Sequence, residues 1–355
     1  MPPQQPPAGA SAGGSGRSGL DPGSAPAPAS TRLTGTTLGM FAIVVLIWLL
    51  SLVVVGGLAA GTAVLLGWRL PVAVALACAV WTASALLVVA RPVEAVLARL
   101  MFRGLRRPGA AELARIVPAL ERVCRRAGAG RAPGGAPDPG RYLLRVQEGQ
   151  QVNAFALGGH VLAVTRVGLD LPDDMLEAVL AHEVGHHLHL HPLAIILGWW
   201  YLLPFEAAER LLRAIRRVTR SLARAFSRLN QQLGGVSGGR AVDGALGMLV
   251  LLAALGVLVV AGSLLVVALG LLWLPLAVLV RLARVLGAAL SRAGEYAADR
   301  HAAELGYGPA LLRVLALFVP AERSARRPRG LAALLRTHPT CEARMLAVAR
   351  THRGA

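Results

Sequence analysis

The chain has 355 residues, of which 55% are hydrophobic and only 16% are charged, and its mean hydropathy is +0.57. This composition excludes an ordinary soluble protein and indicates segments that enter a membrane. The net charge of +18 fits either a nucleic acid or an anionic membrane surface. We favour the membrane and expect no nucleic-acid partner, because the basic residues flank apolar runs and no nucleic-acid-binding motif is present.

All 37 basic residues are arginine, a bias that indicates a GC-rich genome, and we expect a bacterial origin. The three cysteines, Cys78, Cys124 and Cys341, form no C-x-x-C pair. Neither a disulfide framework nor a thiolate zinc site is therefore expected, which fits a reducing cytoplasmic compartment.

The first part of the chain predicts a tail followed by a membrane hairpin. Residues 1–36 are rich in Pro, Gly, Ser and Ala and should be disordered. The runs 38–66 and 70–90 are apolar, and each is long enough to span a bilayer. Arginines crowd the end of the second run, whereas the connection carries only Arg69. The positive-inside rule therefore places the N-terminus and residue 91 onward in the cytoplasm.

An amphipathic helix and a small sheet are predicted next. Residues 111–128 carry apolar side chains on one helical face. Three short strands, bounded by glycine-containing turns, are expected at residues 142–146, 152–156 and 160–165. The edge of such a sheet can bind an extended peptide.

The most informative pattern is His182-Glu183-x-x-His186, an H-E-x-x-H sequence on a predicted helix. Imidazoles at i and i+4 project from one helical face and can share one Zn²⁺. The Glu183 carboxylate can reach a water beside that ion and act as general base. The neighbouring His187 and His189 are interpreted as surface residues.

The segment after this helix predicts a basic arm. Residues 193–205 are apolar but short for a membrane span. Residues 206–229 then place seven arginines against aliphatic side chains, as in a basic amphipathic helix, and a flexible linker follows up to residue 243. This arm either binds an anionic membrane surface or is simply solvated.

The run 245–280 contains no charged residue and is longer than one span requires. Two short spans with a turn near Gly262-Ser263 would return the chain to the compartment it left. We therefore expect a second membrane hairpin within residues 244–282.

Two histidines leave a catalytic zinc one protein ligand short. Glu295 and Asp299 are i and i+4 on a predicted helix, so both can face the metal. One carboxylate can bind zinc directly, and the other can accept the free N–H of a ligating imidazole.

Four elements of the sequence together resemble the integral-membrane zinc endopeptidases that include the HtpX heat-shock proteases and the type I CAAX prenyl proteases. These elements are Asn153-Ala154-Phe155-Ala156, His182-Glu183-x-x-His186, Glu295-Tyr296-x-Ala298-Asp299, and His338-Pro339 with Arg344. They occur in the family's order, and the resemblance covers roughly residues 93–350. His191 falls where many members of the family carry a histidine. The long insertion between His186 and Glu295 departs from the pattern, as does Pro-Thr at positions 339–340.

The resemblance implies a gluzincin-type site that faces the cytoplasm. His182, His186 and Glu295 would bind one zinc ion per chain. Glu183 would take a proton from the attacking water and pass it to the leaving amine. His338 would stabilise the oxyanion of the tetrahedral intermediate.

The resemblance also implies supporting residues. Asp299 would hold a ligating histidine, and Arg344 would anchor the C-terminal helix through a salt bridge to Asp299. The strand with Asn153, Ala154 and Phe155 would hold a polypeptide substrate by β-augmentation.

The predicted fold is a mainly α membrane protein with two transmembrane helical hairpins and a cytoplasmic α+β catalytic domain of the gluzincin type with a small sheet. The expected divisions are the tail 1–36, a hairpin 37–92, the first catalytic part 93–205, the basic arm and linker 206–243, a membrane segment 244–282, and the second catalytic part 283–355.

The leading hypothesis is a multi-pass membrane zinc metalloendopeptidase that cleaves membrane or misfolded proteins at the cytoplasmic face, in protein quality control. A CAAX-type prenyl-peptide protease uses the same chemistry, and a lipidated peptide would discriminate; a bacterial origin argues against it. A non-catalytic scaffold that binds lipid or a partner through the basic arm predicts no stoichiometric zinc, and the intact ligands and base argue against it.

Overall fold

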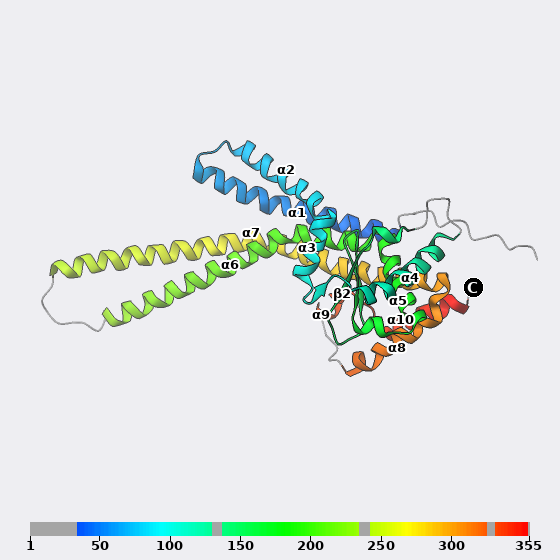
Figure 1. Cartoon of the computed structure of the whole chain (residues 1–355). Coiled ribbons are helices and arrows are strands. Elements are labelled where there is room, and N and C mark those ends of the chain that lie inside the picture. Colours follow the sequence, from blue (N-terminus) through cyan, green and yellow to red (C-terminus); the bar gives the residue numbers. More distant parts are fainter. Residues whose placement is uncertain (1–33, 130–136, 234–241, 325–330, 354–355) are drawn as a thin grey trace, which may run out of the picture.

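The computed structural model describes residues 34–129, 137–233, 242–324 and 331–353 (Figure 1). Helices dominate, and a small mixed sheet lies in the body of the molecule, as predicted. The tail predicted at residues 1–36 falls almost entirely outside the described residues, so its disorder stays a prediction.

Two helices form at the first predicted membrane hairpin, α1 (Gly35–Leu66) and α2 (Leu70–Val88). They pack against each other, and polar side chains satisfy the indole N–H groups between them. Trp48 donates to Thr82 over 3.1 Å, and Trp81 donates to Ser51 over 2.9 Å. Such pairing is needed where no water is available.

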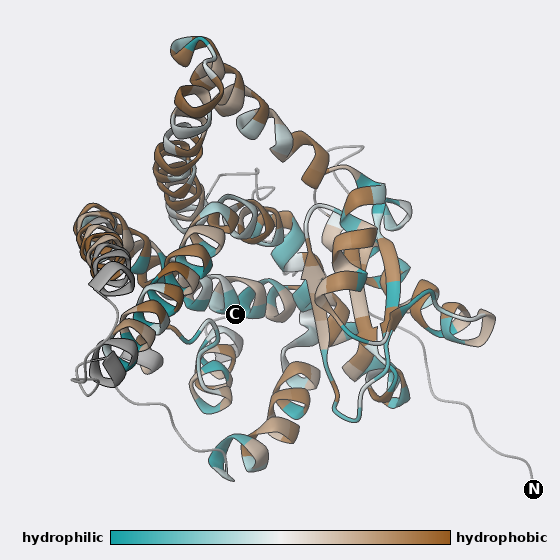
Figure 2. Cartoon of the chain, turned by 90° about the vertical axis from the view of Figure 1, so that its left-hand side faces the viewer, coloured by the Kyte–Doolittle hydropathy of each residue, from teal (hydrophilic) through white to brown (hydrophobic). Residues whose placement is uncertain are grey.

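Among the described residues, three helical stretches are long and apolar enough to cross a membrane: Gly35–Leu66, Leu70–Val88 and Leu252–Ser324, the last of which contains most of α7. A fourth is added if the bent pair of α5 and α6 counts as one span. Figure 2 shows that α1, α2 and much of α7 are hydrophobic along their lengths, whereas the body mixes both kinds of residue. The chain therefore has the helices of a membrane protein.

The turn predicted near Gly262-Ser263 is wrong, because both residues lie inside the single helix α7 (Val242–Ala302). The Ser263 hydroxyl donates to the Val259 carbonyl over 2.7 Å, so it stays bonded within the helix. The partner of α7 is instead α6 (His191–Leu233), which joins the short apolar segment and the basic arm into one helix.

Helices α6 and α7 run side by side and project from the body (Figure 1). Thr219 and Phe226 of α6 lie against Gly262 and Gly256 of α7. Six of the seven arginines of α6 are exposed, namely Arg210, Arg213, Arg217, Arg220, Arg224 and Arg228. At about 100° per residue they fall within an arc of about 80°, on the side of α6 that faces away from α7.

The sheet has four strands in the order β1-β2-β4-β3, and β3 lies at one edge. Strand β2 is parallel to β4, whereas β3 is antiparallel to β4 and β1 is antiparallel to β2. The three predicted strands are confirmed as β2 (Leu143–Gln147), β3 (Ala154–Leu157) and β4 (Val161–Thr165), and the short β1 (Leu105–Arg106) was not predicted.

One face of the sheet packs against helices to form the main core. The remaining helices are α3 (Arg91–Met101), α4 (Ala110–Gly128), α5 (Asp173–Leu188), α8 (Gly308–Ser324), α9 (Leu331–Leu334) and α10 (Cys341–Arg353). Buried side chains of α4, α5 and α8 form one cluster with β2 and β4. Helix α5 is almost entirely buried, so its position is strongly determined by packing.

Helix α3 ties the first two helices to the edge strand of the sheet. The fully buried carboxylate of Glu94 accepts the Gly159 amide over 2.7 Å and lies 3.0 Å from His160 Nδ1, in the turn between β3 and β4. Phe102, just after α3, stacks on Phe155 of β3 with ring centroids 4.1 Å apart. Strand β3 is therefore held by α3 and by the residue that follows this helix.

Candidate active site

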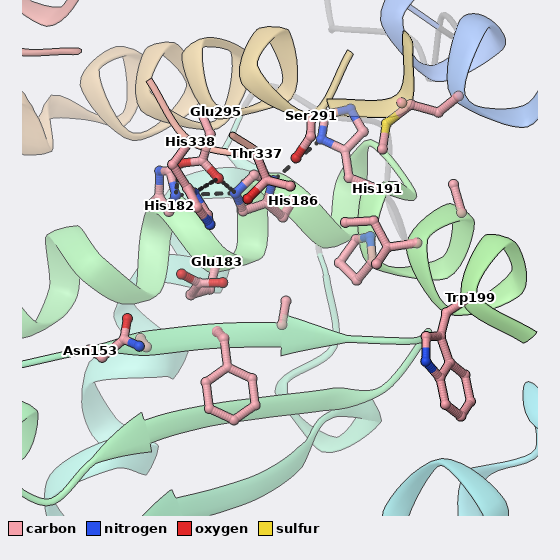
Figure 3. A pocket seen from close by; sticks show the side chains of 18 of the residues that line it. Asn153, His182, Glu183, His186, His191, Trp199, Ser291, Glu295, Thr337 and His338 are labelled. Atoms are coloured by element: carbon pink, nitrogen blue, oxygen red, sulfur yellow. Dashed lines mark hydrogen bonds and ion pairs between the residues drawn. The ribbon is translucent and has the colours of Figure 1, made fainter. Parts of the chain in front are cut away.

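Helix α5 carries the two histidines of the H-E-x-x-H sequence on one face. The helix begins after Pro172 with Asp173 and Asp174 in its first turn, where negative charge favours a helix N-terminus. His182 and His186 lie one helical turn apart on the same face of α5, and their Nε2 atoms are 3.1 Å apart (Figure 3). The expected pairing of imidazoles is therefore present.

Helix α7 brings Glu295 to these histidines. Its carboxylate oxygens lie 3.6 Å from His182 Nε2 and 3.4 Å from His186 Nε2. The close approach of α7 to α5 depends on Gly185, because a Cβ there would lie 3.2 Å from the Ala298 Cα.

These donor atoms fit a zinc ion. One ligand atom from each of His182, His186 and Glu295 lies within 4.8 Å of the others. A tetrahedral zinc with bonds of about 2.0–2.1 Å requires its ligand atoms to be about 3.3–3.4 Å apart. The two Nε2 atoms are 3.1 Å apart, and each lies close to one Glu295 oxygen, His182 at 3.6 Å from Oε2 and His186 at 3.4 Å from Oε1, so the separations are near that value. Two imidazoles and a carboxylate are also a donor set that zinc uses in catalytic sites.

Asp299 and Arg344 contact the donor residues and each other. Asp299 Oδ1 lies 2.9 Å from His182 Nδ1 and accepts the Arg344 guanidinium over 2.6 Å. If His182 donates from Nδ1, its Nε2 lone pair points toward Glu295 and His186. Arg344 also lies 3.0 Å from Glu295, so one cation bridges both carboxylates. The salt bridge expected between Arg344 and Asp299 is thus present in the structure.

The buried charged groups strongly shift one another's pKa values. Burial alone would lower the pKa of His182, but the Asp299 and Glu295 carboxylates outweigh it and raise that pKa to about 10. Burial opposes ionisation of Asp299, yet Arg344 and His182 lower its pKa to about 2. Burial also opposes ionisation of Glu295, yet the neighbouring histidines lower its pKa, so both carboxylates stay negative at neutral pH and attract a cation to the imidazoles, either a proton on His182 or a divalent metal.

Glu183 points from α5 toward the edge strand of the sheet rather than toward α7 (Figure 3). The residue is 6% exposed and borders the same cavity as the histidines. Asn153, Ala154 and Phe155 border that cavity from the strand side. A carboxylate thus lies between the donor cluster and the strand that the sequence predicted to hold substrate.

His338 lies across the cavity from that strand and comes from the segment before α10. Its Nδ1 is 2.9 Å from a Glu295 oxygen, and the side chain is 67% exposed. The imidazole can therefore turn toward a molecule bound in the cavity.

The sequence of residues 118–352 matches the family model described as peptidase family M48. The chain belongs to peptidase family M48. This family includes the HtpX proteases and the type I CAAX prenyl proteases, so the resemblance drawn from the four motifs is confirmed. None of the curated proteins matches the chain. Membership makes the chain a metallopeptidase.

A cavity of about 950 Å³ surrounds the candidate site of this M48 peptidase. On one side it is bordered by β3 and α8, and on the other it continues between α1, α6 and α7. Its walls are mainly apolar, and its polar groups include the donor cluster and Arg284 of α7, which pairs with Glu206 over 2.6 Å. Such pockets bind a chain by shape and orient it by a few polar contacts. The sequence did not predict that α1 and α6 form part of this wall.

The other histidines of the stretch are not all surface residues. His187 is buried, with its Nε2 3.2 Å from the Val161 carbonyl, and burial lowers its pKa to about 4. The surface interpretation was therefore wrong for His187, which packs against the Val161 carbonyl of β4 and the Tyr142 ring. His191 is also buried, and its Nδ1 lies 3.3 Å from His186 Nδ1. Its position beside a candidate ligand was not predicted from the residues.

Proposed function

We propose that this M48 peptidase is a membrane-bound zinc metalloendopeptidase that hydrolyses peptide bonds of membrane or misfolded polypeptides at the cytoplasmic face. The observation that carries the proposal is the cluster of His182, His186 and Glu295, in which one ligand atom from each residue lies within 4.8 Å of the others. Glu183 lies between that cluster and a free strand edge, inside a cavity large enough for a polypeptide segment.

His182, His186 and Glu295 would hold the zinc ion. When bound there, zinc supplies a Lewis acid that polarises the scissile carbonyl and makes a water more acidic. Glu183 accepts the proton that the attacking water loses and delivers it to the leaving amine. His338 turns from Glu295 toward the developing oxyanion and donates a hydrogen bond to it.

The substrate would bind as an extended chain beside β3. An edge strand offers unpaired backbone groups, and a peptide that adds to it is fixed in direction and register. Because successive side chains of an extended chain point to opposite faces, alternate side chains of the bound peptide would face opposite sides of the cleft.

The orientation in the membrane follows from charge. Arginines gather at the end of α2 and in the residues after it, and by the positive-inside rule this charge supports a donor cluster on the cytoplasmic side. We also propose that the exposed arginines of α6 contact anionic lipid headgroups, since they lie in one row and no ion pair joins them to a carboxylate among the described residues.

The decisive test is Glu183→Gln in the purified full-length protein. We expect the wild type to cleave an unfolded protein, a zinc chelator to abolish cleavage, and Glu183→Gln to lose at least about 100-fold in rate while keeping one zinc per chain. Asp174→Asn, an exposed acid on the same helix, is the matched control and should keep the wild-type rate. Full activity of Glu183→Gln would refute this mechanism, and a wild type without stoichiometric zinc would favour a scaffold.

A further inference from the structure

The active-site cavity has an apolar lobe on the side of the membrane helices. This membrane-side lobe is lined by Met40, Val44 and Ile47 of α1 and by Ile195, Trp199 and Leu202 of α6. The α1 residues belong to a helix long and apolar enough to span a bilayer. One helix therefore serves both as a candidate membrane anchor and as a wall of the cleft.

The lobe is continuous with the donor cluster. One cavity is lined both by Glu183 and His186 of α5 and by Pro192, Ile195 and Trp199 of α6. In Figure 3 Trp199 lies beyond the end of the edge strand, away from Asn153. A polypeptide that lies along β3 with its scissile bond at the donor cluster thus has the lobe beside it.

Two glycines keep the lobe open. A Cβ on Gly198 of α6 would meet only a Val44 methyl at 3.8 Å, and a Cβ on Gly287 of α7 would meet nothing within 4 Å. Both border the cavity. By contrast, a Cβ on Gly294 of α7 would lie 2.8 Å from the His191 ring, so that glycine is required by packing.

The packing of the helices therefore does not require glycine at positions 198 and 287. Glycine is also unfavourable inside a helix, so a larger residue at either position would favour the helix itself. A vacant volume between apolar walls is suited to an apolar group from outside the protein.

We propose that the membrane-side lobe is a specificity subsite that takes one large apolar side chain of the cleaved polypeptide, and that Gly198 and Gly287 determine its size. This inference rests on the proposed peptidase function. The occupant is a side chain of the bound substrate, because the lobe opens from the cleft that carries Glu183 and the donor cluster. Removing an aromatic side chain from such a subsite costs roughly 10–200-fold in kcat/KM or more.

The test compares two peptides that differ only in the residues flanking the scissile bond, which are Phe in one and Ala in the other. We expect the wild type to prefer the Phe peptide at least about tenfold in kcat/KM. In Gly198→Leu this Phe-to-Ala preference should fall by at least about tenfold, because the new side chain occupies the lobe. Gly287→Leu fills the lobe from α7 and should have the same effect, so the inference does not depend on one variant folding.

Gly57→Leu is the matched control. Gly57 lies further along α1, its Cβ would meet nothing within 4 Å, and it does not border the cavity. Its substitution should leave the preference unchanged. Zinc content and thermal melting of all three variants show whether each is folded.

A binding measurement separates this inference from the peptidase proposal. In the Glu183→Gln background, fluorescence anisotropy of the labelled Phe peptide should show at least about tenfold weaker binding after Gly198→Leu. A wild type that cleaves neither peptide overturns the proposed function. A wild type that cleaves both, with the preference unchanged in the two filled variants, overturns the subsite alone.

Discussion

Replacing Asp299 with Asn tests whether the residues behind the donor cluster tune its affinity for zinc. Asp299 is 1% exposed, and its oxygens serve both His182, at 2.9 Å, and Arg344, at 2.6 and 2.8 Å. Asparagine keeps the shape but offers one acceptor oxygen instead of two and carries no charge. Either the imidazole or the guanidinium then loses its partner inside a buried site.

We expect Asp299→Asn to weaken zinc binding by about 10–100-fold, the usual loss when a partner of a ligating histidine is removed. This corresponds to about 1.4–2.7 kcal/mol. Competition with a chromogenic chelator, on the purified full-length protein, measures it directly. Asp174→Asn, whose carboxylate pairs with Arg313 at the surface, removes the same charge away from the site. Equal zinc affinity in the two variants would refute the supporting role of Asp299.

The remaining predictions concern stability, positioning and metal linkage. Hydrogen bonds from Arg106 lower the pKa of Glu112 from 4.5 to about 2, so its contribution to stability is complete above pH 4.5 and is lost as the pH falls toward 2. Glu112→Gln should therefore cost about 1 kcal/mol at pH 7 in melting experiments and nothing near pH 2, whereas Glu121→Gln should be silent throughout. Glu94→Leu should raise KM about tenfold with zinc content unchanged, because it frees the turn that holds β3; an unchanged KM contradicts this. Zinc at 100 times its Kd should stabilise the wild type by about 2.7 kcal/mol, and His186→Ala should abolish that shift.

The parts of the site that depend on local spacing could be predicted from the sequence. His182 and His186 need only the repeat of one helix to face a common atom. Glu295 is separated from them by α6 and most of α7, so helical spacing could not show that it meets the histidines. Its spacing with Asp299 showed only that both carboxylates could face a metal. The choice between them came from the resemblance to the membrane zinc endopeptidases.

The parts that depend on packing between distant segments could not be predicted. Nothing in the sequence near Met40 or Trp199 indicates that α1 and α6 meet beside the donor cluster. The same limit explains why the burial of His187 was not predicted: this residue follows a candidate ligand in the sequence, yet its side chain packs against β4. The expected turn at Gly262-Ser263 failed because the apolar run was considered alone, without α6 as its partner.

Once α6 and α7 are seen as partners, the arginines of α6 constrain how the chain sits in a bilayer. Because His182 and Glu295 belong to one cluster, the start of α6 and the end of α7 lie on one side, so the pair crosses an even number of times or not at all. An arginine at the bilayer centre costs about 2.5–3.5 kcal/mol. Six exposed arginines would cost roughly 15–20 kcal/mol, which exceeds the about 5–15 kcal/mol that stabilises a typical domain. The basic row must therefore lie among headgroups or in water, and the length of α7 alone does not decide its path.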